Sequence, residues 1–180
     1  MSTAQTPTPT SESLVPESQI AAGQFLTFLL AGEEYGVDIL KVHEIRGWTP
    51  VTHIPRTPPY VQGVLNLRGA IVPIIDLRRR FDIVKADYTP TTVVIVLAVE
   101  DARGKRVIGM VVDGVSGVIN VAPGETKPSP DFGCAVHTEF IRGMAAIGKR
   151  MVILLDSDKL LTEEEMGALD AVQQQAAKND

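Results

Sequence analysis

Two segments of the chain repeat the same order of turn and apolar residues, which predicts a duplicated β-hairpin. They span residues 63–76 and 143–156, so that the first and last positions of one each lie 80 residues before those of the other. Each begins with glycine, ends with aspartate and carries a glycine-containing turn between two apolar arms. Self-similarity at a fixed spacing is typical of a repeated supersecondary unit. The sequence therefore predicts two related β modules in tandem.

A second hairpin pattern occurs in each half. Residues 25–30 and 35–38 form two apolar runs around a turn, and residues 91–100 and 106–112 repeat this order. Aligning Gly36 with Gly109 places Val42 opposite Val115 and Ile45 opposite Val118. In the first half, apolar residues at spacing three over 39–45 predict one helical turn that passes into a strand.

The number of short strands indicates a mainly β protein closed into barrels. We assign residues 24–88 to the first barrel and 89–161 to the second, and leave open whether a strand crosses the boundary near Tyr88. Residues 162–180 are expected to form a C-terminal helix with a frayed tail, because Thr162 begins a capping signature and Met166, Leu169 and Val172 form an apolar stripe. Residues 1–23, rich in Ser, Thr and Pro, are expected to be a disordered leader.

Composition narrows the possible partners. The 180 residues include 17 basic and 22 acidic ones, and the net charge of −5 opposes binding to a nucleic-acid backbone. No apolar run approaches the ~20 residues that a membrane helix needs, so we expect no insertion into a membrane. The single cysteine, Cys134, favours a reducing compartment, and a cytoplasmic protein is predicted.

One segment nearly matches a phosphate-binding loop. Residues 143–149 follow the loop pattern as far as Lys149, but Arg150 stands where Ser or Thr would hold magnesium. The loop should also open a helix, whereas residues 151–155 have a strand pattern. A nucleotide-binding enzyme that uses Gly143–Lys149 is therefore retained only as an alternative from a different functional class.

Candidate metal ligands and nucleophiles are sparse. Cys134 and His137 are half of a metal site, and only His43 and His53, in the other module, could complete it. A cysteine nucleophile with a histidine base would lack a third, orienting group. The sequence thus predicts no metal, no cofactor and no catalytic residue.

Apolar residues at matching positions of the two modules form two stripes, one of Ile39, Val42 and Ile45, the other of Val112, Val115 and Val118. If an approximate twofold axis relates the modules, both stripes can face one groove that accepts an amphipathic helix. The alternative is that both stripes belong to the barrel cores. Two polar side chains accompany them: Glu44 lies within the first stripe, and Arg68 occupies a hairpin turn from which its guanidinium can bind a carboxylate.

Several blocks in order identify a family. Residues 34–42, 44–47, 66–69 and 71–74, together with Gly63 and residues 111–116, closely resemble the CheW chemotaxis coupling proteins, and the similarity extends from Gln24 to Leu169. This resemblance implies two SH3-like five-stranded β-barrel subdomains in tandem with a C-terminal helix. It also implies a non-catalytic adaptor, cytoplasmic at membrane-associated receptor arrays, that joins the cytoplasmic tips of chemoreceptors to the regulatory domain of the histidine kinase CheA. A coupling protein for a non-flagellar two-component array is the alternative within the family.

The resemblance also nominates binding residues. It implies that the receptor contacts the cleft between the barrels, at Ile39, Val42, Glu44, Ile45, Arg68, Val115 and Val118. It implies kinase contacts at Lys127, Asp131 and Phe132, in the loop after the second stripe.

Overall fold

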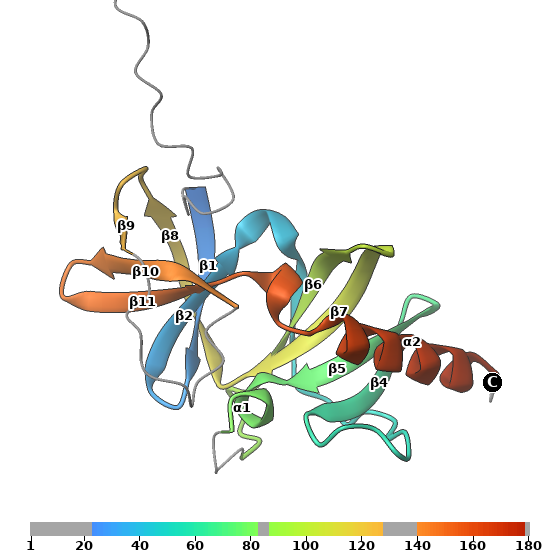
Figure 1. The fold of residues 1–180 in the computed structure, drawn as a ribbon. Helices are drawn as coiled ribbons and strands as arrows, with labels where there is room; N and C mark the ends of the chain where they lie inside the picture. Colours follow the sequence, from blue (N-terminus) through green and yellow to red (C-terminus); the bar gives the residue numbers. More distant parts are fainter. Residues whose placement is uncertain (1–22, 83–86, 128–139, 179–180) are drawn as a thin grey trace, which may run out of the picture.

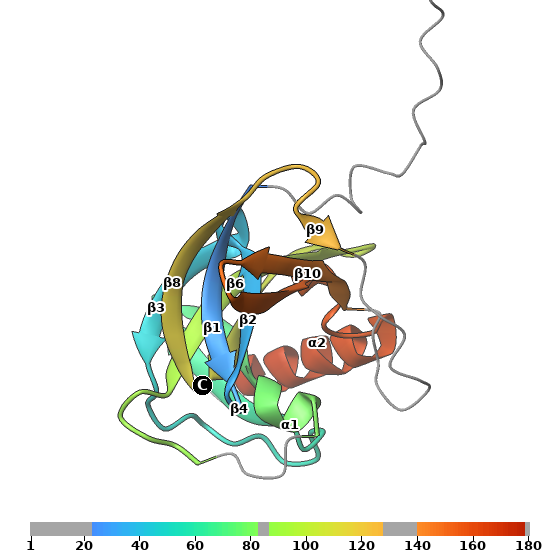
Figure 2. The ribbon, with the colours of Figure 1, turned by 90° about the vertical axis from the view of Figure 1, so that its left-hand side faces the viewer.

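Two mostly antiparallel β-sheets form the body of the protein (Figure 1). The structure is a computed structural model that describes residues 23–82, 87–127 and 140–178. The six-stranded sheet has the order β8-β1-β2-β11-β10-β9, and the five-stranded sheet has the order β3-β6-β7-β5-β4. Figure 2 shows β8, β1 and β2 side by side in the six-stranded sheet. The mainly β fold class predicted from the sequence is confirmed.

The element bounds follow the predicted hairpins. The six-stranded sheet contains β1 (Gly23–Leu30), β2 (Glu33–Asp38), β8 (Gly114–Val121), β9 (Thr126–Lys127), β10 (Ile141–Ile147) and β11 (Arg150–Leu155). The five-stranded sheet contains β3 (Val42–Gly47), β4 (Val61–Leu67), β5 (Ala70–Asp76), β6 (Val93–Asp101) and β7 (Gly104–Val112). The short helices are η2 (Ile39–Lys41), α1 (Leu77–Arg80) and η3 (Ser157–Lys159), and the long helix is α2 (Glu163–Lys178).

The two halves of the chain exchange hairpins. The hairpin β1–β2 lies in the sheet that holds the second-half strands β8 to β11, whereas β6–β7 lies in the sheet that holds β3, β4 and β5. The expected division into 24–88 and 89–161 therefore does not separate the two sheets, and the chain crosses between them at β3 and at β8. A repeat in the sequence shows which strands of the two halves are equivalent. It does not show whether a strand pairs with the hairpin of its own half or with the equivalent hairpin of the other half.

The strand register follows the repeat closely. Each sheet contains one parallel pairing: Ile74 of β5 pairs with Gly109 of β7, and Leu154 of β11 pairs with Gly36 of β2. These pairs are equivalent under the alignments found in the sequence. A Cβ atom at residue 109 would lie 2.4 Å from Ile74 Cδ1, and one at residue 36 would lie 3.1 Å from Leu154 Cδ2. A side chain at residue 109 would therefore displace Ile74, and one at residue 36 would fit tightly against Leu154.

Gly63 on β4 allows a similarly close approach, and its replacement should be costly. Its φ is +148°, and a Cβ atom there would lie 2.1 Å from the carbonyl oxygen of Thr52. We expect Gly63→Ala to lower the free energy of unfolding by about 3 kcal/mol, measured by urea denaturation. Gly47→Ala is the matched control, because nothing lies within 4 Å of a Cβ atom there. An equal effect of the two substitutions would contradict the steric explanation.

One hydrophobic core joins the two sheets. Buried side chains from β1 (Phe28, Leu30) and from β6 (Ile95, Leu97) belong to the same cluster. Burial of this size is the main stabilising contribution in a small domain. The two sheets therefore form one packed body.

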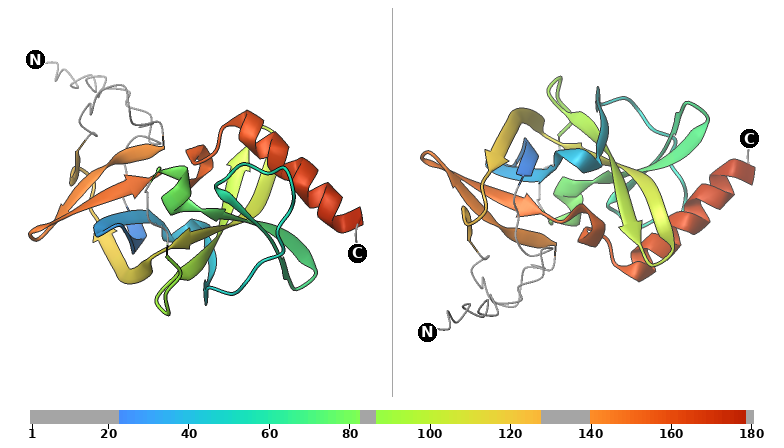
Figure 3. Two further views of the ribbon diagram at one scale, coloured as in Figure 1. Left: turned by 90° about the horizontal axis from the view of Figure 1, so that it is seen from below. Right: turned by 90° about the horizontal axis from the view of Figure 1, so that it is seen from above.

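Helix α2 packs along the five-stranded sheet, and its C-terminal end points away from the six-stranded sheet (Figure 3). The predicted capping box is present: Thr162 Oγ1 accepts a hydrogen bond from Glu165 N at 3.2 Å, and Glu165 Oε2 accepts one from Thr162 N at 2.8 Å. Met166 and Leu169 are buried in the shared core, as the stripe predicted. The side chain of Val172 lies outside the described part of the structure.

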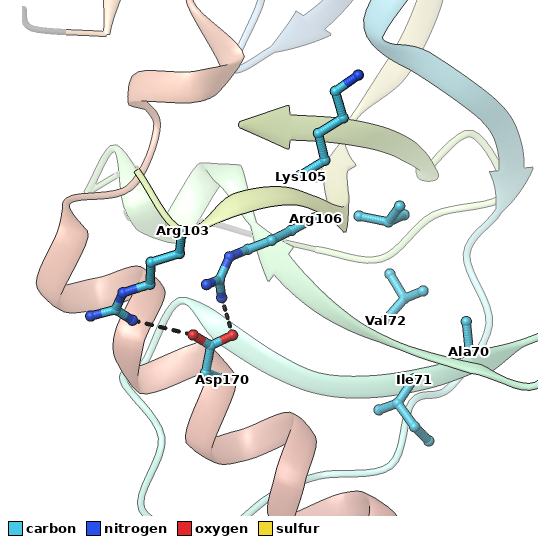
Figure 4. Close-up of a pocket in the computed structure, with 8 residues that line it drawn as sticks. Ala70, Ile71, Val72, Arg103, Lys105, Arg106 and Asp170 are labelled. Atoms are coloured by element: carbon cyan, nitrogen blue, oxygen red, sulfur yellow. Dashed lines mark hydrogen bonds and ion pairs between the residues drawn. The ribbon is translucent and has the colours of Figure 1, made fainter. Parts of the chain in front are cut away.

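Arginines hold α2 in place beside a hollow of about 410 Å³ (Figure 4). Asp170 of α2 accepts hydrogen bonds from Arg103, in the turn before β7, and from Arg106, near the start of β7. Arg80 forms a further ion pair with Glu165 at 3.3 Å. Helix docking therefore combines two apolar anchors with charge-assisted hydrogen bonds.

This charge pairing should make part of the stability depend on pH. The hydrogen bond from Arg106 lowers the pKa of Asp170, although burial opposes the shift. A carboxylate with a lowered pKa in the folded state stabilises the protein above its unfolded-state pKa, and this contribution is lost as pH falls through the folded pKa. We expect Asp170→Asn to lower the melting temperature by about 2–4 °C at neutral pH, and this difference to close below about pH 4. A difference that persists at low pH would contradict this assignment.

Candidate protein-binding surface

The chain passes from one sheet to the other at β3 and again at β8, and these two strands carry most of the predicted apolar stripes. β3 is an edge of the five-stranded sheet and β8 is an edge of the six-stranded sheet. Ile45 on β3 is 44% exposed, and Val115 and Val118 on β8 are 37% and 54% exposed. Large apolar side chains on an edge strand are available to a binding partner. If no partner covers such an edge, it is prone to pair with other chains and aggregate.

The remaining members of the stripes are more buried than predicted. Ile39 and Val42 are partly buried and pack against the shared core, so they combine core and surface contacts. Val112 is fully buried, because it is the last residue of β7 and faces the core rather than the surface. The stripes are therefore core at one end and exposed at the other, and their contact with a partner stays a prediction.

The structure brings Glu44 and Arg68 together. An oxygen of the Glu44 side chain lies 3.3 Å from Arg68 NH2, and Arg46 NH1 lies 3.6 Å from the other oxygen. The Arg68 side chain is 89% exposed, so the pair itself adds little stability. The three groups form a charged cluster at β3, on the opposite face of the strand from Ile45, because successive side chains alternate between the faces.

Arg68 adopts a backbone conformation that is unfavourable for a residue with a side chain. Its φ is +53°, and Gly148, at the same position of the repeated hairpin, has a φ of +62°. Asn66 Oδ1 accepts a hydrogen bond from Gly69 N at 2.9 Å and holds the turn. The left-handed region costs a non-glycine residue roughly 1–2 kcal/mol. The fold thus places a strained arginine where its own repeat uses glycine.

One exposed apolar residue was missed by the sequence analysis. Leu40 in η2 is 87% exposed, directly before β3. Asp38 Oδ1 accepts a hydrogen bond from Leu40 N at 2.9 Å and caps the turn. Leu40 falls between the positions of the apolar stripe, so the spacing of three left it out. A large apolar residue at a position that the stripe leaves to solvent is the signal that could have identified it.

A buried charge network lies beside this surface. Arg78 is 1% exposed, and its Nε and NH2 donate to both oxygens of Asp76, at 3.0 and 2.9 Å. Burial lowers the pKa of Arg78, but hydrogen bonds and charge from Asp76 and Asp113 outweigh burial and raise it. Tyr88 donates to Asp76 Oδ2 at 3.1 Å, and its ring stacks on Trp48 with the centroids 4.2 Å apart. Burial and the charge of Asp76 raise the pKa of Tyr88 to about 12.

Of the nominated kinase contacts, only Lys127 lies in the described residues. It is exposed and lies in β9, a two-residue strand that pairs with β10, rather than in a loop. Asp131 and Phe132 lie outside the described residues, as do Cys134 and His137. The kinase contacts therefore stay a prediction.

The near match to a phosphate loop lies on strands. Residues 143–147 belong to β10, and β11 begins at Arg150, so the segment leads into a strand rather than a helix. Across residues 23–82, 87–127 and 140–178, no three His, Cys, Asp or Glu side chains are placed to hold a metal ion. Within those same ranges, no helix is both long and apolar enough to cross a membrane.

Comparisons with known proteins agree with the strand arrangement. Residues 24–165 match the family described as "CheW-like domain". "Chemotaxis protein CheW" of Klebsiella aerogenes is 51% identical over 149 residues, covering 83% of this chain and 87% of that protein. "Chemotaxis protein CheW" of Rhizobium meliloti is 39% identical over 145 residues, covering 81% of this chain and 91% of that protein. The crystal structure of the scaffolding protein TtCheW from Thermoanaerobacter tengcongensis superposes with a TM-score of 0.68 at 34% identity, covering 78% of this chain and 92% of that chain.

Proposed function

This chain belongs to the CheW-like domain family and is a non-catalytic chemotaxis adaptor, and we propose that it couples the cytoplasmic tips of chemoreceptors to the regulatory domain of the histidine kinase CheA. The observation that carries the receptor half of this proposal is the exposure of Ile45, Val115 and Val118 on two edge strands, with the Glu44–Arg68 ion pair on the first of them. Such a surface suits an amphipathic helix with basic and acidic residues along its edges.

The proposed receptor-binding surface consists of Ile39, Val42, Glu44, Ile45, Arg68, Val115 and Val118. Ile45, Val115 and Val118 supply exposed apolar area, and the charged pair supplies orientation. Ile39 and Val42 tie the surface to the core. The kinase would be contacted near Lys127, Asp131 and Phe132, so that both partners bind one rigid body.

The adaptor would act by position rather than by chemistry. If it holds receptor and kinase in a fixed relative pose, a small rearrangement of the receptor changes which kinase conformation is favoured. This coupling needs a different affinity for the two receptor states. The proposal places the protein in the cytoplasm, at membrane-associated receptor arrays.

Val118→Asp tests the receptor contact. Because Val118 is 54% exposed, we expect the variant to fold normally but to bind a receptor cytoplasmic fragment about 30-fold or more weakly, measured by calorimetry. Met151→Asp on β11 is the matched control, since Met151 is similarly exposed at 46% and lies three strands away from β8. Equal binding by wild type and Val118→Asp would remove β8 from the site. An ATP titration with a measurable affinity would favour the nucleotide-binding alternative.

A further inference from the structure

We propose that Asp113 is a positioning residue that fixes β8 relative to β3, and so sets the spacing of the two apolar stripes. This inference rests on the proposed function, because it concerns the same receptor-binding surface. The stripes lie on edge strands of different sheets. Their relative position therefore depends on how firmly the two sheets are joined.

Besides the shared core, one carboxylate bonds to both sheets and forms a joint between them. Asp113 lies between β7 and β8, two residues before Val115. Its Oδ1 accepts a hydrogen bond from Arg78 NH1 at 3.1 Å, and its Oδ2 accepts one from Ala31 N at 2.8 Å. Arg78 follows β5 of the five-stranded sheet, whereas Ala31 is in the β1–β2 turn of the six-stranded sheet. The backbone N of Asp113 also donates to Leu29 O at 3.0 Å.

The cation on the other side of this joint is itself immobilised. Arg78 is almost fully buried, and besides its bonds to Asp76 it donates from NH1 to Asp87 O at 2.6 Å. A planar guanidinium with so many fixed acceptors has one orientation available. Asp113 is thus bound to a fixed point of the five-stranded sheet.

The same cation is connected to the end of β3. Arg78 Cζ lies 5.0 Å from the centroid of the Tyr88 ring, and that ring stacks on Trp48. Trp48 directly follows β3 and donates from its backbone N to Thr92 O at 3.0 Å. A continuous set of contacts therefore leads from the end of the β3 stripe to the start of the β8 stripe.

The equivalent joint of the repeat is built differently. There, Asp158 of η3 lies at the position of Arg78 and pairs at 3.4 Å with Lys41 of η2, one residue after the position of Asp113. Both of those side chains are about one third exposed; Asp113 is similarly exposed, at 37%, but its partner Arg78 is only 1% exposed. Water screens the first pair more strongly than the second. The Asp113 joint is thus the firmer of the two.

The test uses Asp113→Asn, which keeps the size of the side chain but removes its charge. We expect receptor-fragment affinity to fall about tenfold at a temperature well below melting, because the stripes lose their fixed spacing. A pair of spin labels at Lys105→Cys and Met151→Cys, in a Cys134→Ser background, reports the distance between the two sheets. Their distance distribution should broaden in Asp113→Asn. Asp170→Asn is the control, because it removes a carboxylate with two arginine partners at α2, away from both stripes.

The affinity and the label distance together decide whether Asp113 positions the two stripes. Weaker binding and a broadened distribution in Asp113→Asn, with wild-type values in Asp170→Asn, would support the proposal. Wild-type affinity in Asp113→Asn would overturn it, and so would an equal loss of affinity in both variants, since that points to general destabilisation. If the wild-type protein binds no receptor fragment, the proposed function itself fails, and this inference with it.

Discussion

Replacing Arg68 by glutamate is expected to weaken binding to a receptor fragment by about 100-fold, while replacing it by glycine should weaken binding without loss of stability. The glutamate would repel Glu44, which lies 3.3 Å from the guanidinium in the wild type, and would reverse the charge at that point of the proposed surface. A truncated interface anchor typically costs about 2–4 kcal/mol of binding free energy. Calorimetric titration with the same fragment measures both variants.

The glycine variant separates binding from folding. Glycine removes the strain of a φ of +53° but is more flexible in the unfolded chain, so we expect Arg68→Gly to be as stable as the wild type, or more stable by up to about 1 kcal/mol. Gly148→Arg is the reciprocal control at the equivalent turn, and should lose stability but keep receptor affinity. If Arg68→Gly bound the receptor like the wild type, the strained arginine would have no role in this contact.

Replacing Arg78 by methionine should have the largest effect on stability of any change considered. It leaves Asp76, which is 0% exposed, without its cation, and an uncompensated buried charge costs about 3–5 kcal/mol. Urea denaturation followed by Trp48 fluorescence measures the loss, since Trp48 is the only tryptophan and stacks on the adjacent Tyr88.

A double variant tests the reason for this loss. Asp76→Asn removes the charge but keeps an acceptor for the helix-capping bond from Arg78 N. The double variant Asp76→Asn, Arg78→Met should therefore recover part of the stability lost in the single variant. A loss of less than about 1 kcal/mol in Arg78→Met would show that water reaches Asp76 and compensates it.

Local features of the fold followed from the sequence because each depends on neighbouring residues. The hairpin at residues 63–76 was predicted from its glycines and apolar arms, and the start of α2 from the capping box at Thr162. The turn at residues 39–41 passes into β3 as the spacing of apolar residues indicated. Such signals are encoded within a few residues of the element that they specify.

Long-range features could not be predicted in the same way. The exchange of hairpins depends on which of two similar partners each strand meets, and local pattern does not distinguish them. The contact between Glu44 and Arg68 joins a strand to a distant turn. Arg78 is the first of three successive arginines, a pattern typical of a solvated surface, yet it is buried, because Asp76 and Asp113 converge on it from different elements.

The interleaved topology has a consequence for synthesis of the protein. Among the described hairpins, β1–β2 is made first; it pairs with β8 and with β11, and β11 ends close to the C-terminal helix. Its apolar face must therefore stay unsatisfied until nearly the whole chain has emerged. Contacts between residues so far apart slow folding and leave the nascent chain prone to aggregation. Neither half of the chain can therefore complete its own sheet before strands of the other half have been made.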